Sequence, residues 1–489
     1  MIIKNYRRII NISNTIFYVK GVIVLIDKIF NPLKLLGNSE KLGDLPGGET
    51  IFKKTVAIAW PAVLESFLIS IVAMVDNIMV SSLGTYAIAA IGLTTQPKFI
   101  GFAIIISMNV AVSALVARRR GENDRAGANK VLKQALVVSA ILIAIISVTF
   151  TAAAVPLLNF CGAQPDTIEP STQYFRIIMS CSCFQLFSMV LNAAQRGVGR
   201  TKIAMRTNIV SNLVNVLFNY LLIGGKFGFP ALGVKGAAIA TVLGSMAACA
   251  ISLASICKRD GYLNIRMMKG PVFDSSIIKS MAKLTGGTLT EQLCFRFGFL
   301  MFSMIVANLG TEAYATHQIA MNCMHMSFAI GDGFSVAAVS LVGMNLGAKR
   351  SDLAKVYGLA CKRLGRIFAV LLCIFFVFGG RYVYYLFTDD INMINLGAVI
   401  VKILAVILFF QIDQVITSGC LKGAGDTKYV AKVAFISVAV IRPLAAWSFC
   451  YPLGLGLVGA WIGTLCDQLT RNVMNASRFK SGKWAEIKL

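Results

Sequence analysis

Long apolar runs alternate with short polar segments along most of the chain, beginning near residue 55. A helix needs about 20 mostly apolar residues to cross the hydrocarbon core of a bilayer, which is ~30 Å thick. The runs are continuous and lack the period-two alternation of membrane β-strands, so they predict transmembrane helices. Twelve spans are predicted, at residues 55–83, 86–117, 129–155, 170–193, 203–224, 233–257, 278–308, 312–345, 354–378, 394–421, 430–450 and 456–478.

Lys and Arg residues collect in every second segment between the predicted spans. The basic segments are 118–133, 196–206, 258–269 and 346–366. The opposite loops differ from these, because 151–169 has no basic residue and 379–395 has only Arg381. Cytoplasmic loops of membrane proteins retain Lys and Arg. The pattern therefore predicts a multi-pass protein of the cell (cytoplasmic) membrane, with both termini in the cytoplasm.

The sequence repeats itself with an offset of 226 residues, since Leu-Gly-Thr at 83–85 recurs at 309–311. The same offset pairs Glu65 with Glu291. A repeat of six spans preserves the orientation of the second half, which relates the halves by an axis along the membrane normal. We therefore predict an all-α integral membrane protein with twelve transmembrane helices in two six-helix lobes. A pseudo-two-fold axis along the membrane normal should relate the lobes, with a central cavity between them.

This pattern divides the chain into four segments. They are a cytoplasmic or interfacial N-terminal extension at 1–50, a first lobe at 51–270, a second lobe at 271–480 and a cytoplasmic tail at 481–489. The extension has no counterpart in the second half, and its apolar stretch from Ile16 to Phe30 is short for a span and interrupted by charged residues. We expect it to form an interfacial helix or a loose tail.

Composition agrees with a membrane protein and argues against several other classes. Hydrophobic residues make up 57% of the 489 residues and charged residues only 14%, and the mean hydropathy is +0.73. The formal charge of +25 is gathered in loops, so no nucleic-acid partner is expected. The twelve Cys fall mostly in apolar runs without metal-site or disulfide spacing, and we expect buried thiols. The sequence has no phosphate-loop or zinc-protease motif, so neither an enzyme nor a cofactor is predicted.

Two carboxylates lie inside the first predicted span. Each charge at the centre of a span costs about 2.5–3.5 kcal/mol on the insertion scale, so such residues point to function. Glu65 and Asp76 are eleven residues apart, which places them on one face of a helix. A coupling or binding role is one interpretation, and simple pairing with a buried Arg is the other.

The fifth predicted span carries four amides on a single helical stripe. Their spacing is 4, 3 and 4 residues, at Asn208, Asn212, Asn215 and Asn219. Such a stripe can hold helices together, and with Asp76 it also supplies the hard oxygen ligands that a small desolvated cation requires. The second half has Ile441 and Ala445 at the positions equivalent to the last two amides, so a cation site is expected in the first lobe alone.

The second half has its own set of ionisable residues inside predicted spans. They are Glu291, Arg296, Asp332, Asp413, Arg442 and Asp467, with His317 and His325. Glu291 and Asp413 are candidates to face the cavity and to contribute to binding or coupling. Arg296 and Arg442 are expected to be their counter-ions, and the two His are expected to make helix–helix hydrogen bonds.

Several motifs accompany this architecture. The first span opens with Trp60-Pro61 and closes with Val-Asp-Asn-Ile-Met-Val at 75–80, and further motifs are ATHQIA at 315–320, LVGMNLGA at 341–348 and LKGAGDT at 421–427. Together with the spans and the repeat, they resemble the multidrug and toxic compound extrusion (MATE) family over about residues 50–480. The resemblance implies exchange of incoming Na+ or H+ for outgoing, often cationic and amphipathic compounds, by alternating access between two lobes.

The resemblance also implies roles for particular residues. Asp76 matches the family's coupling Asp on the first helix, and Asn215, Asn219 and Thr241 match its oxygen-bearing partners on the fifth and sixth helices. Asp76, Asn215 and Asn219 are therefore the expected Na+ ligands if Na+ is the coupling ion. The residues with a possible cavity or coupling role are Glu65, Glu291, Asp413 and Asn212.

The expected function is therefore cation-coupled antiport of drugs and toxic compounds. Its expected partners are organic cations or amphipathic drugs and the lipid bilayer, with the protein acting as a monomer. The alternative is a flippase or exporter of a lipid-linked or anionic metabolite on the same two-lobe topology, which a strongly cationic cavity would favour. A membrane-embedded enzyme is a more distant rival, because the sequence offers no metal or nucleophile constellation.

Overall fold

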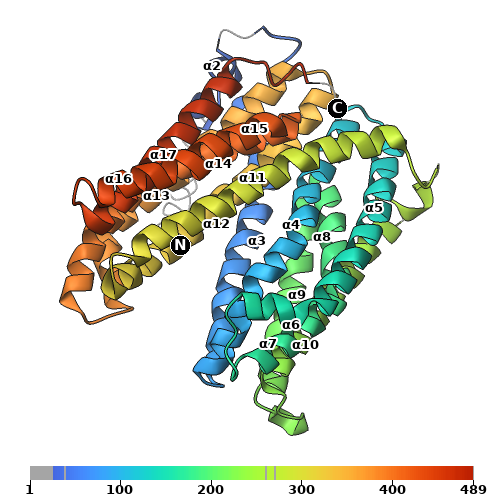
Figure 1. Cartoon of the computed structure of the whole chain (residues 1–489). Coiled ribbons are helices and arrows are strands. Elements are labelled where there is room, and N and C mark those ends of the chain that lie inside the picture. Colours follow the sequence, from blue (N-terminus) through green and yellow to red (C-terminus); the bar gives the residue numbers. More distant parts are fainter. Residues whose placement is uncertain (1–25, 38–39, 259–260, 269–270, 488–489) are drawn as a thin grey trace, which may run out of the picture.

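The long helices of the protein form two groups that lean against each other (Figure 1). The computed structural model describes residues 26–37, 40–258, 261–268 and 271–487, and every regular element in this part of the chain is a helix. The first group comprises α3 (Gly48–Ser81), α4 (Thr85–Gly121), α5 (Arg125–Ala152), α6 (Ala154–Phe160), α7 (Ile168–Ser180), α8 (Ser182–Gly197), α9 (Thr201–Leu222) and α10 (Gly233–Cys257). The second comprises α11 (Ser275–Ala307), α12 (Thr311–Gly347), α13 (Ser351–Tyr385), α14 (Ile391–Ala424), α15 (Thr427–Ala434), η3 (Phe435–Ile441), α16 (Arg442–Cys450) and α17 (Gly456–Lys480).

These two groups are the two predicted lobes, and they confirm the all-α, two-lobe architecture. Among the described residues, nine helices are long and apolar enough to cross a membrane, or ten if α7 and α8, bent by 49°, form one span. The other two predicted spans correspond to α9 and α17. Both helices are less apolar than the others because they carry many polar residues. Four of these polar side chains, Asn215 and Asn219 of α9 and Asp467 and Arg471 of α17, are buried inside the protein.

The repeated Leu-Gly-Thr motif forms the same turn in both lobes. Gly84 precedes α4 with a φ of 106°, and Gly310 precedes α12 with a φ of 103°. Residues that carry a Cβ rarely adopt a positive φ of this kind. Glycine adopts it without a steric penalty because it has no Cβ. The motif therefore recurs because each lobe needs the same tight connection between its first two helices.

The two lobes meet most closely at the end of the helices that carries the basic segments, here called the basic end. A Cβ on Gly121 would lie 1.8 Å from the carbonyl oxygen of Met344, and one on Gly347 would lie 2.0 Å from that of Arg118. These two contacts are equivalent under the 226-residue repeat, so the backbones of α4 and α12 touch reciprocally. Away from this contact the two groups of helices diverge toward what we call the open end (Figure 1).

Part of the N-terminal extension packs against the second lobe. The short helix α2 (Pro32–Leu36) places Leu35 and Leu36 in a hydrophobic core with side chains of α12, α13 and α14. The ammonium group of Lys355 in α13 donates to the carbonyl of Leu36 at 3.0 Å, and the backbone N–H of Leu42 donates to Asp352 at 3.1 Å. The described residues 26–37 and 40–47 are thus not the loose tail that was one of the two expectations. Most of the apolar stretch from Ile16 to Phe30 lies outside the described residues.

Candidate functional site

The Asp76 carboxylate of α3 lies against two amides of α9. The Asn219 side chain donates to Asp76 Oδ1 at 2.9 Å. In the amide orientation that satisfies its neighbours, Asn215 donates to both Asp76 oxygens at 2.9 and 3.2 Å and accepts from the Thr241 backbone N–H at 3.2 Å. The structure therefore brings the four residues expected at the coupling site into one cluster, here called the Asp76 cluster.

The amide stripe of α9 divides between Glu65 and Asp76 of α3. Asn208 donates to Glu65 Oε1 at 2.5 Å, eleven residues before Asn219 reaches Asp76. The two helices run side by side in a constant register, since each amide follows its carboxylate by 143 residues. Asn212 lies between them and keeps a buried side-chain nitrogen with no hydrogen-bond partner.

Two residues next to the Asp76 cluster were not expected from the sequence. Lys98 of α4 interacts electrostatically with Asp76. Tyr174 of α7 is buried and interacts with both Asp76 and Thr241. The sequence could have singled out Lys98, because it is the one Lys inside the predicted span 86–117. It could not have singled out Tyr174, since a Tyr in an apolar segment is ordinary.

The repeat relates one ion pair in the first lobe to one ion pair in the second lobe. Glu65 of α3 pairs with Arg196 of α8, and Glu291 of α11 pairs with Lys422 of α14 at 2.8 Å. Both acids and both bases are separated by 226 residues. The two carboxylates are buried, with exposed fractions of 3% and 5%. The expectation that Arg296 would neutralise Glu291 is therefore wrong.

Asp413 is enclosed within the second lobe. Its oxygens contact the ammonium group of Lys362 at 3.1 Å, Arg366 Nε at 2.7 Å and the Asn472 amide at 3.1 Å. Only 2% of Asp413 is exposed. These partners come from α13 and α17, so the second expected counter-ion, Arg442, is also wrong.

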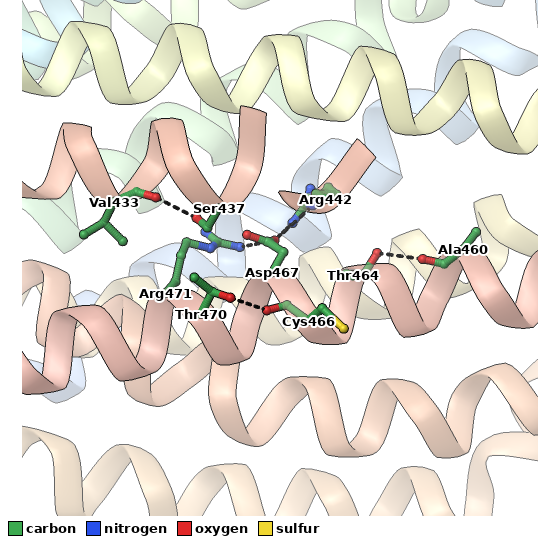
Figure 2. A network of polar contacts seen from close by, with 9 residues as sticks. All are labelled: Val433, Ser437, Arg442, Ala460, Thr464, Cys466, Asp467, Thr470 and Arg471. Atoms are coloured by element: carbon green, nitrogen blue, oxygen red, sulfur yellow. Dashed lines mark hydrogen bonds and ion pairs between the residues drawn. The ribbon is translucent and has the colours of Figure 1, made fainter. Parts of the chain in front are cut away.

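Arg442 instead belongs to a sealed network around Asp467. Figure 2 shows Arg442 and Arg471 on either side of this carboxylate, at 2.5 Å and 2.9 Å from Asp467 Oδ2. Each guanidinium also lies over an aromatic ring of α11, with Phe299 4.5 Å from Arg442 and Phe295 5.1 Å from Arg471. Arg442 directly follows the π-helical segment η3, which interrupts the regular helix before it.

The second lobe has aromatic side chains where the first has the Asp76 cluster. The repeat partner of Asp76 is Phe302, whose ring lies 5.3 Å from that of His317 and 6.5 Å from that of Trp461. His317 packs among these rings, and its Nδ1 atom has no hydrogen-bond partner. The two lobes thus share a helical plan and differ in the chemistry at equivalent positions.

Two exposed charged side chains of the second lobe, Arg296 and Asp332, lie at the boundary between the lobes. The Arg296 guanidinium of α11 lies 4.4 Å from the ring of Phe99 in α4, a cation–π contact between the lobes. Asp332 of α12 is exposed although its neighbour Gly333 packs tightly against Val63 of α3. Ionisable groups at the boundary between the lobes are therefore not fully enclosed by protein.

These features define a class of protein. Two repeat-related lobes of membrane-spanning helices, with ionisable groups held inside them, are the architecture of a secondary transporter. A family model described as MatE matches residues 61–221 and 288–447, one block in each lobe. The chain therefore belongs to the MATE family, and it is a multi-pass membrane protein.

Comparison with individual proteins agrees with this assignment. The chain is 30% identical over 440 residues to the "Probable multidrug resistance protein NorM" of Thermotoga maritima, covering 89% of this chain and 93% of that protein. It is 23% identical to the "Multidrug resistance protein MdtK" of Edwardsiella ictaluri, covering 88% and 95%. Its fold is similar to a structure described as the outward-facing conformation of a multidrug resistance MATE family transporter, with a TM-score of 0.82, 23% identity and coverage of 92% and 98%.

Proposed function

We propose that the protein is a cation-coupled antiporter that exports amphipathic, often cationic compounds by alternating access, with Asp76 as the coupling carboxylate. The observation that carries this proposal is the contact of Asp76 with Asn215 and Asn219 at 2.9 Å each. Among the carboxylates of α3, Glu65 already has Arg196 as an ion-pair partner. Asp76 accepts hydrogen bonds from neutral amides, and Lys98 acts on it electrostatically but makes no ion-pair contact with it in the described part of the chain. Of these two carboxylates, Asp76 is therefore the more available to a cation from outside.

The residues around Asp76 suit either coupling ion. An amide offers two N–H donors on one side and an oxygen acceptor on the other, so rotation of its end group exchanges one for the other. In the structure both amides donate to the carboxylate. With Na+ bound, Asn215, Asn219 and the Thr241 hydroxyl would present oxygen atoms, the ligands that hard cations prefer. With H+ bound, the carboxylic acid would donate to one of the same oxygen atoms.

The direction of transport follows from the charge of the loops. The basic end holds the Lys and Arg residues that cytoplasmic loops retain, so compounds would leave the protein at the open end. The relatives named as multidrug resistance proteins support drugs as the substrate class. Under this proposal the binding of a cation at Asp76 and the release of the exported compound use alternate states of the two lobes.

Transport by purified protein in liposomes tests the proposal. Ethidium serves as the organic cation, and a Na+ gradient and a proton gradient are imposed separately. We expect one of the two gradients to drive ethidium movement by the wild-type protein, and we expect Asp76→Asn to abolish this movement. Expression should persist, because removal of a charge from within a span eases membrane insertion.

Two outcomes would contradict the proposal. Gradient-driven movement by Asp76→Asn at the wild-type rate would remove Asp76 from the coupling step. Failure of both gradients to drive ethidium with the wild-type protein would favour the alternative, an exporter of a lipid-linked or anionic metabolite.

A further inference from the structure

Asp332 lies where the two lobes meet. It occupies α12, and a Cβ on the next residue, Gly333, would be 2.5 Å from the Val63 Cα atom of α3. Eight residues further along α12, the Ser340 hydroxyl donates to the carbonyl of Arg196 in the first lobe at 2.5 Å. This stretch of α12 therefore runs along the surface of the first lobe, and Asp332 is exposed within it.

The two repeat-related ion pairs flank Asp332. Its carboxylate is attracted by Arg196 from the first lobe and by Lys422 from the second, and it is repelled by Glu65 and Glu291. We call these five residues the interlobe charge cluster. Four of them are symmetric under the repeat, whereas Asp332 is not, because its repeat partner is Ile106.

The charges of the cluster do not cancel. Glu65 and Arg196 neutralise each other, as do Glu291 and Lys422. Within the described part of the chain, Asp332 makes neither a hydrogen bond nor an ion pair of its own. When Asp332 is ionised, the cluster therefore carries one uncompensated negative charge between membrane-spanning helices, where an unpaired charge is costly.

We propose that Asp332 binds the positively charged group of the exported compound. This inference rests on the proposed function and adds a substrate site separate from the Asp76 cluster. A monovalent organic cation fits, because it restores neutrality and the exposed carboxylate can receive it directly. An anion does not fit, since Arg196 and Lys422 are already neutralised by their own carboxylates.

The position of the site links substrate binding to the lobe boundary. Asp332 interacts electrostatically with the ion pairs of both lobes, Glu65–Arg196 of the first and Glu291–Lys422 of the second. A cation that neutralises Asp332 therefore changes the electrostatic interactions of both lobes at their boundary.

Equilibrium binding of ethidium to the purified full-length protein in detergent tests the site. Fluorescence anisotropy gives the Kd for the wild type and for Asp332→Asn, Asp332→Glu and Asp389→Asn. Asp389 is an exposed loop carboxylate of the same lobe at the open end, which makes Asp389→Asn the charge-matched control. We expect Asp332→Asn to raise the Kd about tenfold or more, which corresponds to about 1.4 kcal/mol. Asp332→Glu should keep the Kd within about threefold of the wild type, and Asp389→Asn should leave it unchanged.

Other results would overturn the inference. An Asp332→Asn variant that binds ethidium as the Asp389→Asn variant does would remove Asp332 from the site and leave the proposed function standing. If Na+ or protons at constant ionic strength weaken ethidium binding to the wild type as much as Asp332→Asn does, and leave that variant unaffected, Asp332 holds the coupling ion instead. A wild-type protein that binds no ethidium would overturn both the site and the proposed substrate class.

Discussion

At the scale of single residues, Glu65 and Asp76 of α3 differ in how their charge is balanced. Glu65 has a guanidinium partner in Arg196, and Asp76 has two amides. A hydrogen bond to a charged group contributes about 1.5–3 kcal/mol and leaves the net charge unchanged. Two neighbouring acids on one helix face therefore have different capacities to bind a cation from outside.

The amides of the Asp76 cluster should matter more than their repeat partners. Asn219→Ala removes one hydrogen bond to the carboxylate, and we expect gradient-driven ethidium transport in liposomes to fall by about tenfold or more. Asn215→Ala should act in the same direction. The matched controls, Ile441→Ala and Ala445→Gly, change equivalent positions of the second lobe. Equal losses in all four variants would mean that the amides only hold helices together.

Removal of Lys422 should destabilise the second lobe. Lys422→Met leaves the buried Glu291 carboxylate without its ion-pair partner, a change that costs about 3–5 kcal/mol. The double variant Glu291→Gln with Lys422→Met removes both charges and should recover part of this loss. Thermal unfolding of the purified proteins in detergent measures both effects. A single variant as stable as the double variant would show that the pair is unimportant for stability.

At the scale of elements, two glycines set the distance between the lobes. Gly121 at the end of α4 and Gly347 at the end of α12 let the two backbones approach reciprocally. Small residues allow such contacts between membrane helices, where packing and not the hydrophobic effect drives association. The basic end is therefore closed by backbone contact as well as by side chains.

A methyl group at this contact should disturb it. Gly121→Ala would place the new Cβ 1.8 Å from the Met344 carbonyl oxygen, so the helices must move apart. Overpacking of this kind costs typically about 1–3 kcal/mol, and we expect a lower unfolding temperature. Gly92→Ala in the same helix is the control, because nothing lies within 4 Å of its Cβ position. Unfolding temperatures that match in the two variants would argue against a close contact at Gly121.

At the scale of the whole molecule, the repeat arranges two similar lobes around one boundary but does not make them equivalent. The first lobe holds the Asp76 cluster, and the second holds aromatic rings around Phe302 and a sealed network around Asp467. Asp332 adds a charge that the first lobe lacks. A transporter with two such lobes can use one for the coupling ion and the boundary for its substrate.

The orientation of the molecule in the membrane is open to a direct test. Cysteines introduced at Asp124 and Ser351, at the basic end, should react only with reagents that reach the cytoplasm. Those at Asp166 and Asn392, at the opposite end, should react from outside, because each Lys or Arg kept in the cytoplasm adds to the bias. The twelve native thiols must first be replaced. Access to Asp124 and Asp166 from the same side would exclude the third span and the two-lobe topology with it.

The sequence alone determined the spans, the repeat and the residues of the Asp76 cluster. Span length and apolar character are local properties, so they can be read along the chain. The amide spacing on α9 is also local, and it placed Asn215 and Asn219 on one stripe. The repeat compares the chain with itself and needs no coordinates. The same offset also relates Arg196 to Lys422, as it relates Glu65 to Glu291, but it does not say which base contacts which acid.

Only the tertiary structure decided which charges are partners. Arg296 and Arg442 were expected to neutralise Glu291 and Asp413, and both assignments were wrong. The choice among several bases depends on which helices lie side by side and how they are rotated, and these are contacts between residues far apart in the chain. The docking of α2 on α13 and the exposure of Asp332 have the same origin, because burial of a side chain is set by the neighbouring elements and not by its own helix.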